Sequence, residues 1–274
     1  MNNSAIGMFD SGIGGLTVYR ALKSVLPEES VIYLGDTARL PYGSKSAASI
    51  TRFSEENTSF LLGFGVKLVV VACNSSSAHA VHYLRQHFKV PVVGVIEPGA
   101  MAAAAMPGKR IGIIGTNATV ASGAYEKAIH ELRREVEIVS HACPLFVPLV
   151  EEGWLDHPAT RLVAAEYLAP LRQAQIETLV LGCTHYPLLR SIIEEYMGTA
   201  VRLVDSAAAL AAEVKRLLAV MNLSTSESTA GSDSFFVTDF PERFQRVGEI
   251  FLDRKIPEVS LAQLPAGGKN AVIS

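Results

Sequence analysis

The chain has 274 residues, of which 49% are hydrophobic and 19% are charged, and its formal net charge is −3. This composition excludes a disordered chain and favours an α/β protein with a large core. The charges form no basic stripe, so we expect no nucleic-acid partner. No apolar run approaches the roughly 20 residues that span a bilayer, and the N-terminus lacks a signal-peptide pattern. We therefore expect a cytoplasmic protein without membrane association.

Short apolar runs alternate with helical patterns from the N-terminus onward, which predicts parallel βαβ units. A glycine-rich loop at 10–15 and a longer loop at 35–43 separate the first elements. The predicted strands of this part cover 6–9, 31–34, 68–72 and 92–95. The predicted helices cover 16–25, 46–64 and a segment that ends near residue 86.

The same alternation begins again at residue 110. Strands are predicted at 110–115, 136–140, 178–181 and 201–204, helices at 122–134, 158–174, 187–195 and after 206, and a loop at 143–150. A Ser/Thr-rich loop at 223–234 precedes a last strand at 235–238 and a helix at 241–252. Because the interval from Asp10 to Cys73 nearly equals that from Thr116 to Cys183, the halves form a weak duplication. We predict two similar α/β domains with mainly parallel sheets flanked by helices, and an active site in the cleft between them.

The chain contains three cysteines, and their odd number and spacing argue against a disulfide framework. Cys73 and Cys183 each end an apolar β-branched run and precede small polar residues. Ligands bind at the carboxyl ends of parallel strands, so these two thiols could face one substrate from opposite sides. A buried cysteine is more often an inert apolar residue, and the residues alone leave both interpretations open. Cys143, which precedes a proline, is assigned to packing.

For either thiol to act as a base, its pKa must fall below the usual value of about 8.5. A helix N-terminus after each cysteine would lower the pKa, and His185 would do the same for Cys183. Only Cys183 and His185 approach the spacing of metal ligands, so we expect no metal site.

The loop 10–15 fails as a dinucleotide fingerprint because Thr17 stands where the third glycine would be. Its backbone could instead cradle a carboxylate. Asp10 is either a helix N-cap or a site acid that orients an ammonium group or holds a proton near Cys73. Residues after the other strands are likewise either turn and cap residues or substrate donors, namely Tyr42, Gly43, Asn74, Ser75 and Thr184.

Segments 9–17, 35–43, 71–74 and 181–188 closely resemble the aspartate/glutamate racemase family, and within it the glutamate racemases as a group. The resemblance runs from about residue 6 to residue 206 and resumes at 235–244. It implies a cofactor-independent racemase that interconverts L- and D-glutamate and supplies D-glutamate for peptidoglycan. Aspartate or a hydantoin remains the alternative substrate.

The family architecture implies that the C-terminal segment returns to the first domain. The predicted domains are therefore 1–96 plus 207–274, and 97–206. We also expect a homodimer.

The family's two catalytic cysteines correspond to Cys73 and Cys183, with Asp10 and His185 as acid–base partners. One cysteine would remove the α-proton as a thiolate, and the other would donate a proton to the opposite face. Ser75 stands where the family usually has Thr, which keeps the hydroxyl and loses a methyl group. The substrate-binding residues implied by the resemblance are Asp10, Ser11, Tyr42, Gly43, Asn74, Ser75, Thr116, Thr119, Thr184 and His185.

Overall fold

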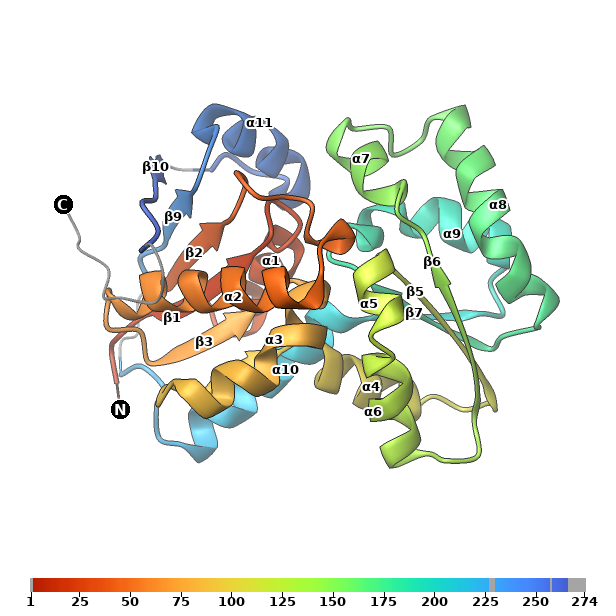
Figure 1. Cartoon of the computed structure of the whole chain (residues 1–274), viewed down its shortest axis with the longest axis horizontal. Helices are drawn as coiled ribbons and strands as arrows, with labels where there is room; N and C mark the ends of the chain where they lie inside the picture. The colour runs from red at the N-terminus through yellow and green to blue at the C-terminus, as the bar shows by residue number, and fades with distance from the viewer. Residues whose placement is uncertain (1, 227–229, 257, 266–274) are drawn as a thin grey trace.

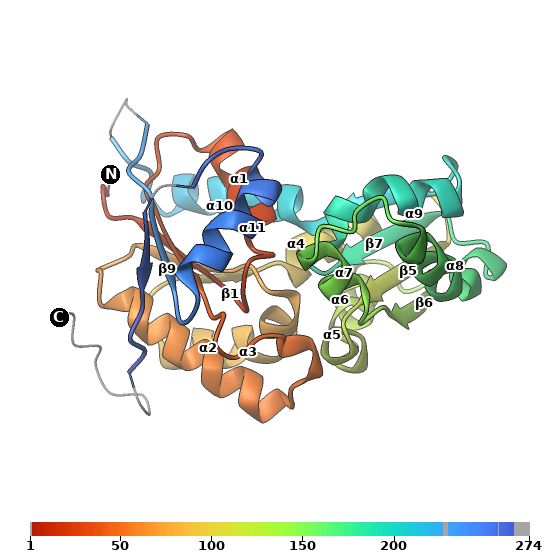
Figure 2. The ribbon, with the colours of Figure 1, turned by 90° about the horizontal axis from the view of Figure 1, so that it is seen from above.

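The computed structural model describes residues 2–226, 230–256 and 258–265. It contains two parallel sheets, each flanked by helices, that lie side by side (Figures 1 and 2). The predicted two-domain α/β class is confirmed.

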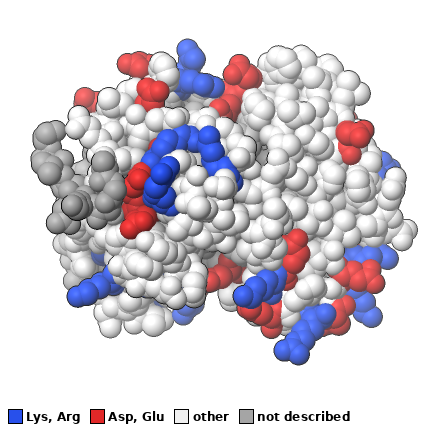
Figure 3. Space-filling view, viewed as in Figure 1, with Lys and Arg blue, Asp and Glu red and all other residues white. Residues whose placement is uncertain are grey.

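On the face shown in Figure 3, basic side chains are interspersed with acidic ones.

The first sheet has six strands in the order β10-β9-β2-β1-β3-β4, and every pair is parallel. Its strands are β1 (Ile6–Asp10), β2 (Val31–Gly35), β3 (Leu68–Val71), β4 (Val92–Gly94), β9 (Ser234–Val237) and β10 (Val259–Leu261). The central strand β1 is buried along its whole length because helices cover both sheet faces. Phe9 and Val71 face one layer of the core, and Met8 and Val70 face the other.

Helices α2 and α3 cover one face of this sheet, and α1, α10 and α11 cover the other (Figure 1). The bounds are α1 (Leu16–Val25), α2 (Ala47–Leu62), α3 (Asn74–His87), α10 (Ser206–Val220) and α11 (Pro241–Leu252), with a short 3-10 helix η1 (Tyr42–Ser44). The C-terminal segment extends the sheet, because β9 pairs with β2 and places Phe236 beside Leu34.

The second sheet has the order β6-β5-β7-β8 and is also parallel. Its strands are β5 (Arg110–Gly115), β6 (Glu137–Ala142), β7 (Thr178–Gly182) and β8 (Arg202–Asp205). Its helices are α4 (Ile96–Ala104), α5 (Asn117–Ala121), α6 (Ala124–Leu132), α7 (Phe146–Glu151), α8 (Pro158–Gln173) and α9 (Arg190–Met197), with a 3-10 helix η2 (Tyr186–Leu189). Side chains of α4 and α6 pack on one face, and those of α7, α8 and α9 pack on the other.

The structure differs from the predicted elements in a few places. The segment 143–150 was predicted as a loop, but it contains most of α7. Pro148 is compatible with this helix because it lies in the first turn, where backbone N–H groups have no helical partner. The predicted helix 122–134 is present as α6, but the short helix α5 before it was not predicted; Gly123, whose φ is +61°, separates the two.

Two further differences lie near the C-terminus. Strand β10 was not predicted, because three residues are too short for a pattern. Of the predicted loop 223–234, residues 227–229 lie outside the described residues.

Candidate active site

Cys73 and Cys183 occupy equivalent positions in the two sheets. Cys73 follows β3 and is the N-cap residue of α3, and Cys183 follows β7 directly. Strand β3 pairs with β1, and β7 pairs with β5, which are the first strands of their sheets in chain order. Both cysteines are free and buried, and both line the same pocket between the two sheets.

This pocket brings together all the predicted site residues except Asp10 and Thr119, which lie buried behind its wall. Its free volume is about 20 Å³, enough for about one water molecule. Val147, from α7, and Pro41 also line it and were missed by the sequence analysis. The lining residues are Ser11, Pro41, Tyr42, Gly43, Cys73, Asn74, Ser75, Thr116, Val147, Cys183, Thr184 and His185.

Cys73 lies in a buried, polar setting. Its Sγ donates a hydrogen bond to Ser11 Oγ at 3.6 Å. Burial, followed by the negative charge of Asp10, raises the pKa of the Cys73 thiol to about 11. The backbone N–H of Ser76 at the start of α3 does lower this pKa, as expected, but the cost of burying a thiolate exceeds its effect. The expected net fall of the pKa is therefore wrong.

Asp10 is fully buried at the carboxyl end of β1. Its Oδ2 accepts a hydrogen bond from the Gly12 backbone N–H at 3.0 Å, and its Oδ1 has no partner among the described residues. Burial raises the pKa of Asp10, although the charge of His185 opposes this. The N-cap alternative for Asp10 is wrong, because the N-cap residue of α1 is Gly15.

Cys183 has a cationic neighbour instead. Its Sγ lies 3.8 Å from Nδ1 of His185, and Nε2 of the same ring lies 3.3 Å from Oε1 of Glu151. Burial disfavours the imidazolium, but Cys183 and Glu151 outweigh it and raise the pKa of His185 to about 10. Burial likewise opposes ionisation of Glu151, but the hydrogen bond from His185 outweighs it and lowers the pKa of that carboxyl.

The secondary structure that follows Cys183 also differs from the prediction. The sequence predicted that an α-helix starts soon after this cysteine, but a turn and η2 follow, and α9 begins only at Arg190. The N-terminus of an α-helix therefore lies further from Cys183 than predicted, and the nearby positive charge comes from His185. Glu151 was missed by the sequence analysis, since its segment was predicted as a loop and carried no motif.

Two glycines allow the two halves of the molecule to approach closely at the pocket. A Cβ atom on Gly14 would collide with the side chains of Thr184 and His185, and one on Gly43 would lie 2.5 Å from Cβ of Thr116. In the same region Thr17 Oγ1 donates a hydrogen bond to the backbone carbonyl of Thr184 at 2.9 Å. The loop 10–15 therefore packs directly against the Cys183 loop.

Hydroxyl and amide groups line the remaining wall. Oγ of Ser75 lies 2.9 Å from Oγ1 of Thr116 and 3.3 Å from Oγ1 of Thr119. Asn74 donates through Nδ2 to the Tyr125 hydroxyl at 2.8 Å, and its Oδ1 has no partner among the described residues. These groups are fixed by the protein before any ligand arrives, which is the preorganisation that stabilises developing charge.

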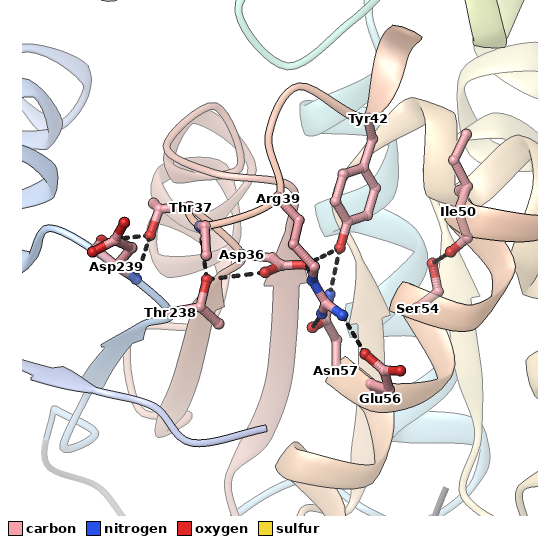
Figure 4. A network of polar contacts seen from close by, with 11 residues as sticks. Asp36, Thr37, Arg39, Tyr42, Ile50, Ser54, Glu56, Asn57, Thr238 and Asp239 are labelled. Atoms are coloured by element: carbon pink, nitrogen blue, oxygen red, sulfur yellow. Dashed lines mark hydrogen bonds and ion pairs between the residues drawn. The ribbon is translucent and has the colours of Figure 1, made fainter. Parts of the chain in front are cut away.

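Tyr42 reaches the pocket from the β2–α2 loop and is held by a buried polar network (Figure 4). Its hydroxyl donates to Oδ2 of Asp36 and accepts from Nδ2 of Asn57 at 3.1 Å. Asp36 also accepts from Nε of Arg39 at 2.7 Å and from Oγ1 of Thr238 at 2.9 Å. The Tyr42 hydroxyl is thus engaged within the protein, which leaves the backbone of this loop to face a ligand.

Within residues 2–226, 230–256 and 258–265, no group of three or more His, Cys, Asp or Glu side chains could hold a metal ion. In the same residues, no helix combines the length and apolar character needed to cross a membrane.

The fold and the site together define a two-domain α/β protein with one thiol from each domain at a shared pocket. A sequence profile of the Asp/Glu/hydantoin racemase family matches residues 6–214. The chain is 52% identical over 263 residues to the glutamate racemase of Geobacter metallireducens, covering 96% of this chain and 97% of that protein. It belongs to the Asp/Glu/hydantoin racemase family, among the glutamate racemases, and is thus an amino-acid racemase.

Solved structures of glutamate racemases also resemble this chain closely. A glutamate racemase isoform from Bacillus anthracis superimposes with a TM-score of 0.93 at 39% identity, covering 97% of this chain and 99% of that one. The Francisella tularensis glutamate racemase in complex with D-glutamate gives a TM-score of 0.90 at 37% identity, with coverages of 96% and 98%.

Proposed function

We propose that this chain interconverts L- and D-glutamate without a cofactor, by proton transfer at two cysteines. One observation carries the proposal: Cys73 and Cys183 end equivalent strands of the two sheets and line one pocket. Two thiols on opposite sides of an α-carbon can remove a proton from one face and supply one to the other. The relatives named glutamate racemases, including the one solved with D-glutamate, support glutamate as the substrate.

In the proposed reaction, one thiolate breaks the Cα–H bond and the electron pair remains on carbon. The other thiol then donates its proton to the opposite face of that carbanion, so the configuration inverts and no net oxidation occurs. Cys73, with its pKa of about 11, is a protonated thiol near neutrality. His185, whose pKa is raised to about 10, lies beside Cys183, so we propose that it exchanges protons with this thiol.

The two thiols would exchange protons with different partners. His185 serves Cys183 as acid–base partner. Asp10 does not line the pocket, so we propose that its carboxylate takes up the proton of Cys73 when this thiol is to act as the base, rather than binding the substrate ammonium group directly. The substrate carboxylates would be bound by the hydroxyl and amide donors of the wall and by the backbone of the Tyr42 loop. These fixed donors would stabilise the carbanionic transition state. The binding residues so proposed are Ser11, Tyr42, Gly43, Asn74, Ser75, Thr116 and Thr184. Thr119, which was predicted to bind substrate, does not line the pocket and contacts Ser75 instead.

The pocket must open before glutamate can enter, because its volume of about 20 Å³ holds roughly one water. We propose that the two domains separate to admit the substrate and close again over it. Closure would expel water and place both thiols at the α-carbon.

Cysteine variants test the proposal. We expect Cys73→Ala and Cys183→Ala each to lose racemisation by at least about a thousandfold, since each removes one of the two proton-transfer groups. Circular dichroism follows the racemisation, and proton NMR in deuterated water follows exchange at Cα. Cys143→Ala is the matched control, because Cys143 is buried but does not line the pocket. Racemisation at the parental rate by either site variant would show that the two-thiol scheme is wrong.

A substrate comparison separates glutamate from the alternatives. We expect L-glutamate to have a higher kcat/KM than L-aspartate or a hydantoin. A preference for either alternative would assign the chain to another activity of the same family.

We further propose a cytoplasmic homodimer that supplies D-glutamate for peptidoglycan. Its domains would comprise 1–96 plus 207–274, and 97–206; the pairing of β9 with β2 supports the return of the C-terminal segment. Residues 227–229, 257 and 266–274 of the first domain lie outside the described residues. Light scattering tests the dimer. Growth of a depleted strain on added D-glutamate tests the cellular role.

A further inference from the structure

An arginine joins the two domains beside the pocket. Helix α11, which follows β9 of the first sheet, lies across from α7 of the second half in both views (Figures 1 and 2). Nη2 of Arg243 on α11 lies 3.5 Å from Oε2 of Glu151 and 3.7 Å from Oε1 of Glu152. This ion pair therefore connects elements that would separate if the domains opened.

Glu151 has two partners, one on each carboxylate oxygen. Oε2 faces Arg243, and Oε1 lies 3.3 Å from Nε2 of His185. The other ring nitrogen of His185 lies 3.8 Å from Sγ of Cys183. A continuous series of contacts thus leads from α11 of the first domain to the thiol of the second.

The two carboxylates near Arg243 differ in how strongly their charges interact with it. The Glu152 side chain is 68% exposed, so its interaction with Arg243 is screened by water and weak. The Glu151 side chain is only 9% exposed, and its charge is screened much less. The Arg243 side chain is 46% exposed, so its guanidinium can move from Glu151 into solvent.

We propose that Arg243 is a positioning residue for the proposed racemisation: on closure of the cleft it fixes the Glu151 carboxylate, which holds His185 against Cys183. An imidazole with a fixed partner on one nitrogen keeps its other nitrogen in a constant direction. The direct contact of this pair is with the Cys183 thiol, whereas Cys73 contacts Ser11 and lies near Asp10. Domain closure is thereby linked to proton transfer at Cys183. This inference depends on the proposed function.

The test is Arg243→Met, with Arg246→Met as the matched control. Arg246 is an exposed arginine three residues further along α11. We expect Arg243→Met to lower kcat/KM by roughly tenfold, the scale of a modest misplacement of a catalytic group. Because the equilibrium constant between enantiomers is one, this decrease must be equal in the two directions. Arg246→Met should keep the parental kcat/KM. Arg243→Lys keeps the positive charge and should lose less kcat/KM than Arg243→Met.

Deuterium isotope effects distinguish positioning of Cys183 from a general loosening of the cleft. The substrates are L- and D-glutamate deuterated at Cα, each compared with its protonated form. If only the Cys183 step is slowed, the isotope effect on kcat/KM increases for the enantiomer that Cys183 deprotonates. It decreases for the other enantiomer, whose deuterium is removed by Cys73 before the slow step.

The possible results distinguish a failure of this inference from a failure of the proposed function. Opposite changes of the two isotope effects support the role of Arg243. Equal changes, or an unchanged kcat/KM in Arg243→Met, overturn it. If the parental enzyme does not racemise glutamate, the proposed function fails instead. A double-mutant cycle with Glu151→Gln gives a second criterion, since residues that act through one contact have non-additive effects.

Discussion

Ser75 and Thr116 face each other across the cleft, with 2.9 Å between Oγ and Oγ1. Ser75 belongs to the first turn of α3, and Thr116 is the N-cap residue of α5. Two helix N-termini, one from each domain, therefore meet through a pair of hydroxyl groups at the pocket.

This contact leads to the first prediction. Ser75→Ala removes one hydroxyl and leaves Thr116 and Thr119 without this partner. We expect a loss of about 1 kcal/mol of unfolding free energy. We also expect a kcat/KM reduced by roughly tenfold, because a fixed donor for the substrate disappears. Urea unfolding and racemisation assays measure the two effects. Ser75→Thr restores the hydroxyl and should keep both values near the parental level; a loss as large as that of the alanine variant would exclude the hydroxyl as the cause.

A second prediction concerns the Cys73 thiol, whose pKa of about 11 is caused by burial and then by the charge of Asp10. Asp10→Asn removes that charge and should lower the pKa of Cys73. Alkylation proceeds through the thiolate, so iodoacetamide should modify Cys73 faster in the variant at pH 8. Peptide mass spectrometry gives the rate for Cys73 separately, and alkylation of Cys143 in the same sample reports any general opening of the fold. An unchanged Cys73 rate would contradict the electrostatic role of Asp10.

The pKa of His185 predicts how stability depends on pH. It is about 10 in the folded protein and about 6.5 in the unfolded chain. A raised pKa stabilises the fold fully below about pH 6.5, and this stabilisation disappears as the pH rises through about 10. We expect the difference in Tm between the parental protein and His185→Gln to narrow steadily from pH 6.5 to 10. Thermal unfolding at several pH values measures it; a constant difference would mean that His185 is neutral in the folded protein.

The close approach at Gly14 gives a further prediction. A Cβ atom there would collide with Thr184 and His185, whereas one on Gly12 would lie 3.3 Å from the end of the flexible Leu40 side chain. We expect Gly14→Ala to cost about 1–3 kcal/mol of unfolding free energy and to reduce racemisation strongly. Gly12→Ala should have a much smaller effect on both. Similar losses in the two variants would show that backbone freedom of the loop, rather than space, is what matters.

Much of the fold could be predicted because it depends on patterns within a few residues. The periodicity of apolar residues gave the bounds of α1, α11 and β5 as the structure has them. The polar residues after β3 and β7 identified the strand ends that carry Cys73 and Cys183. Where the local pattern was ambiguous, as in the proline-containing α7, the prediction was wrong.

The sequence by itself determined the strand–turn–helix junctions and the residue types placed there, since hydrogen bonding and side-chain alternation act between near neighbours. Only the tertiary structure decided the charge state of the site. The pKa of Cys73 depends on burial by both halves and on Asp10, 63 residues away by number. His185 meets Glu151, 34 residues away, and Glu151 meets Arg243 on a helix of the other domain. Burial and Coulomb interactions depend on distance in space, and the folded chain alone sets those distances.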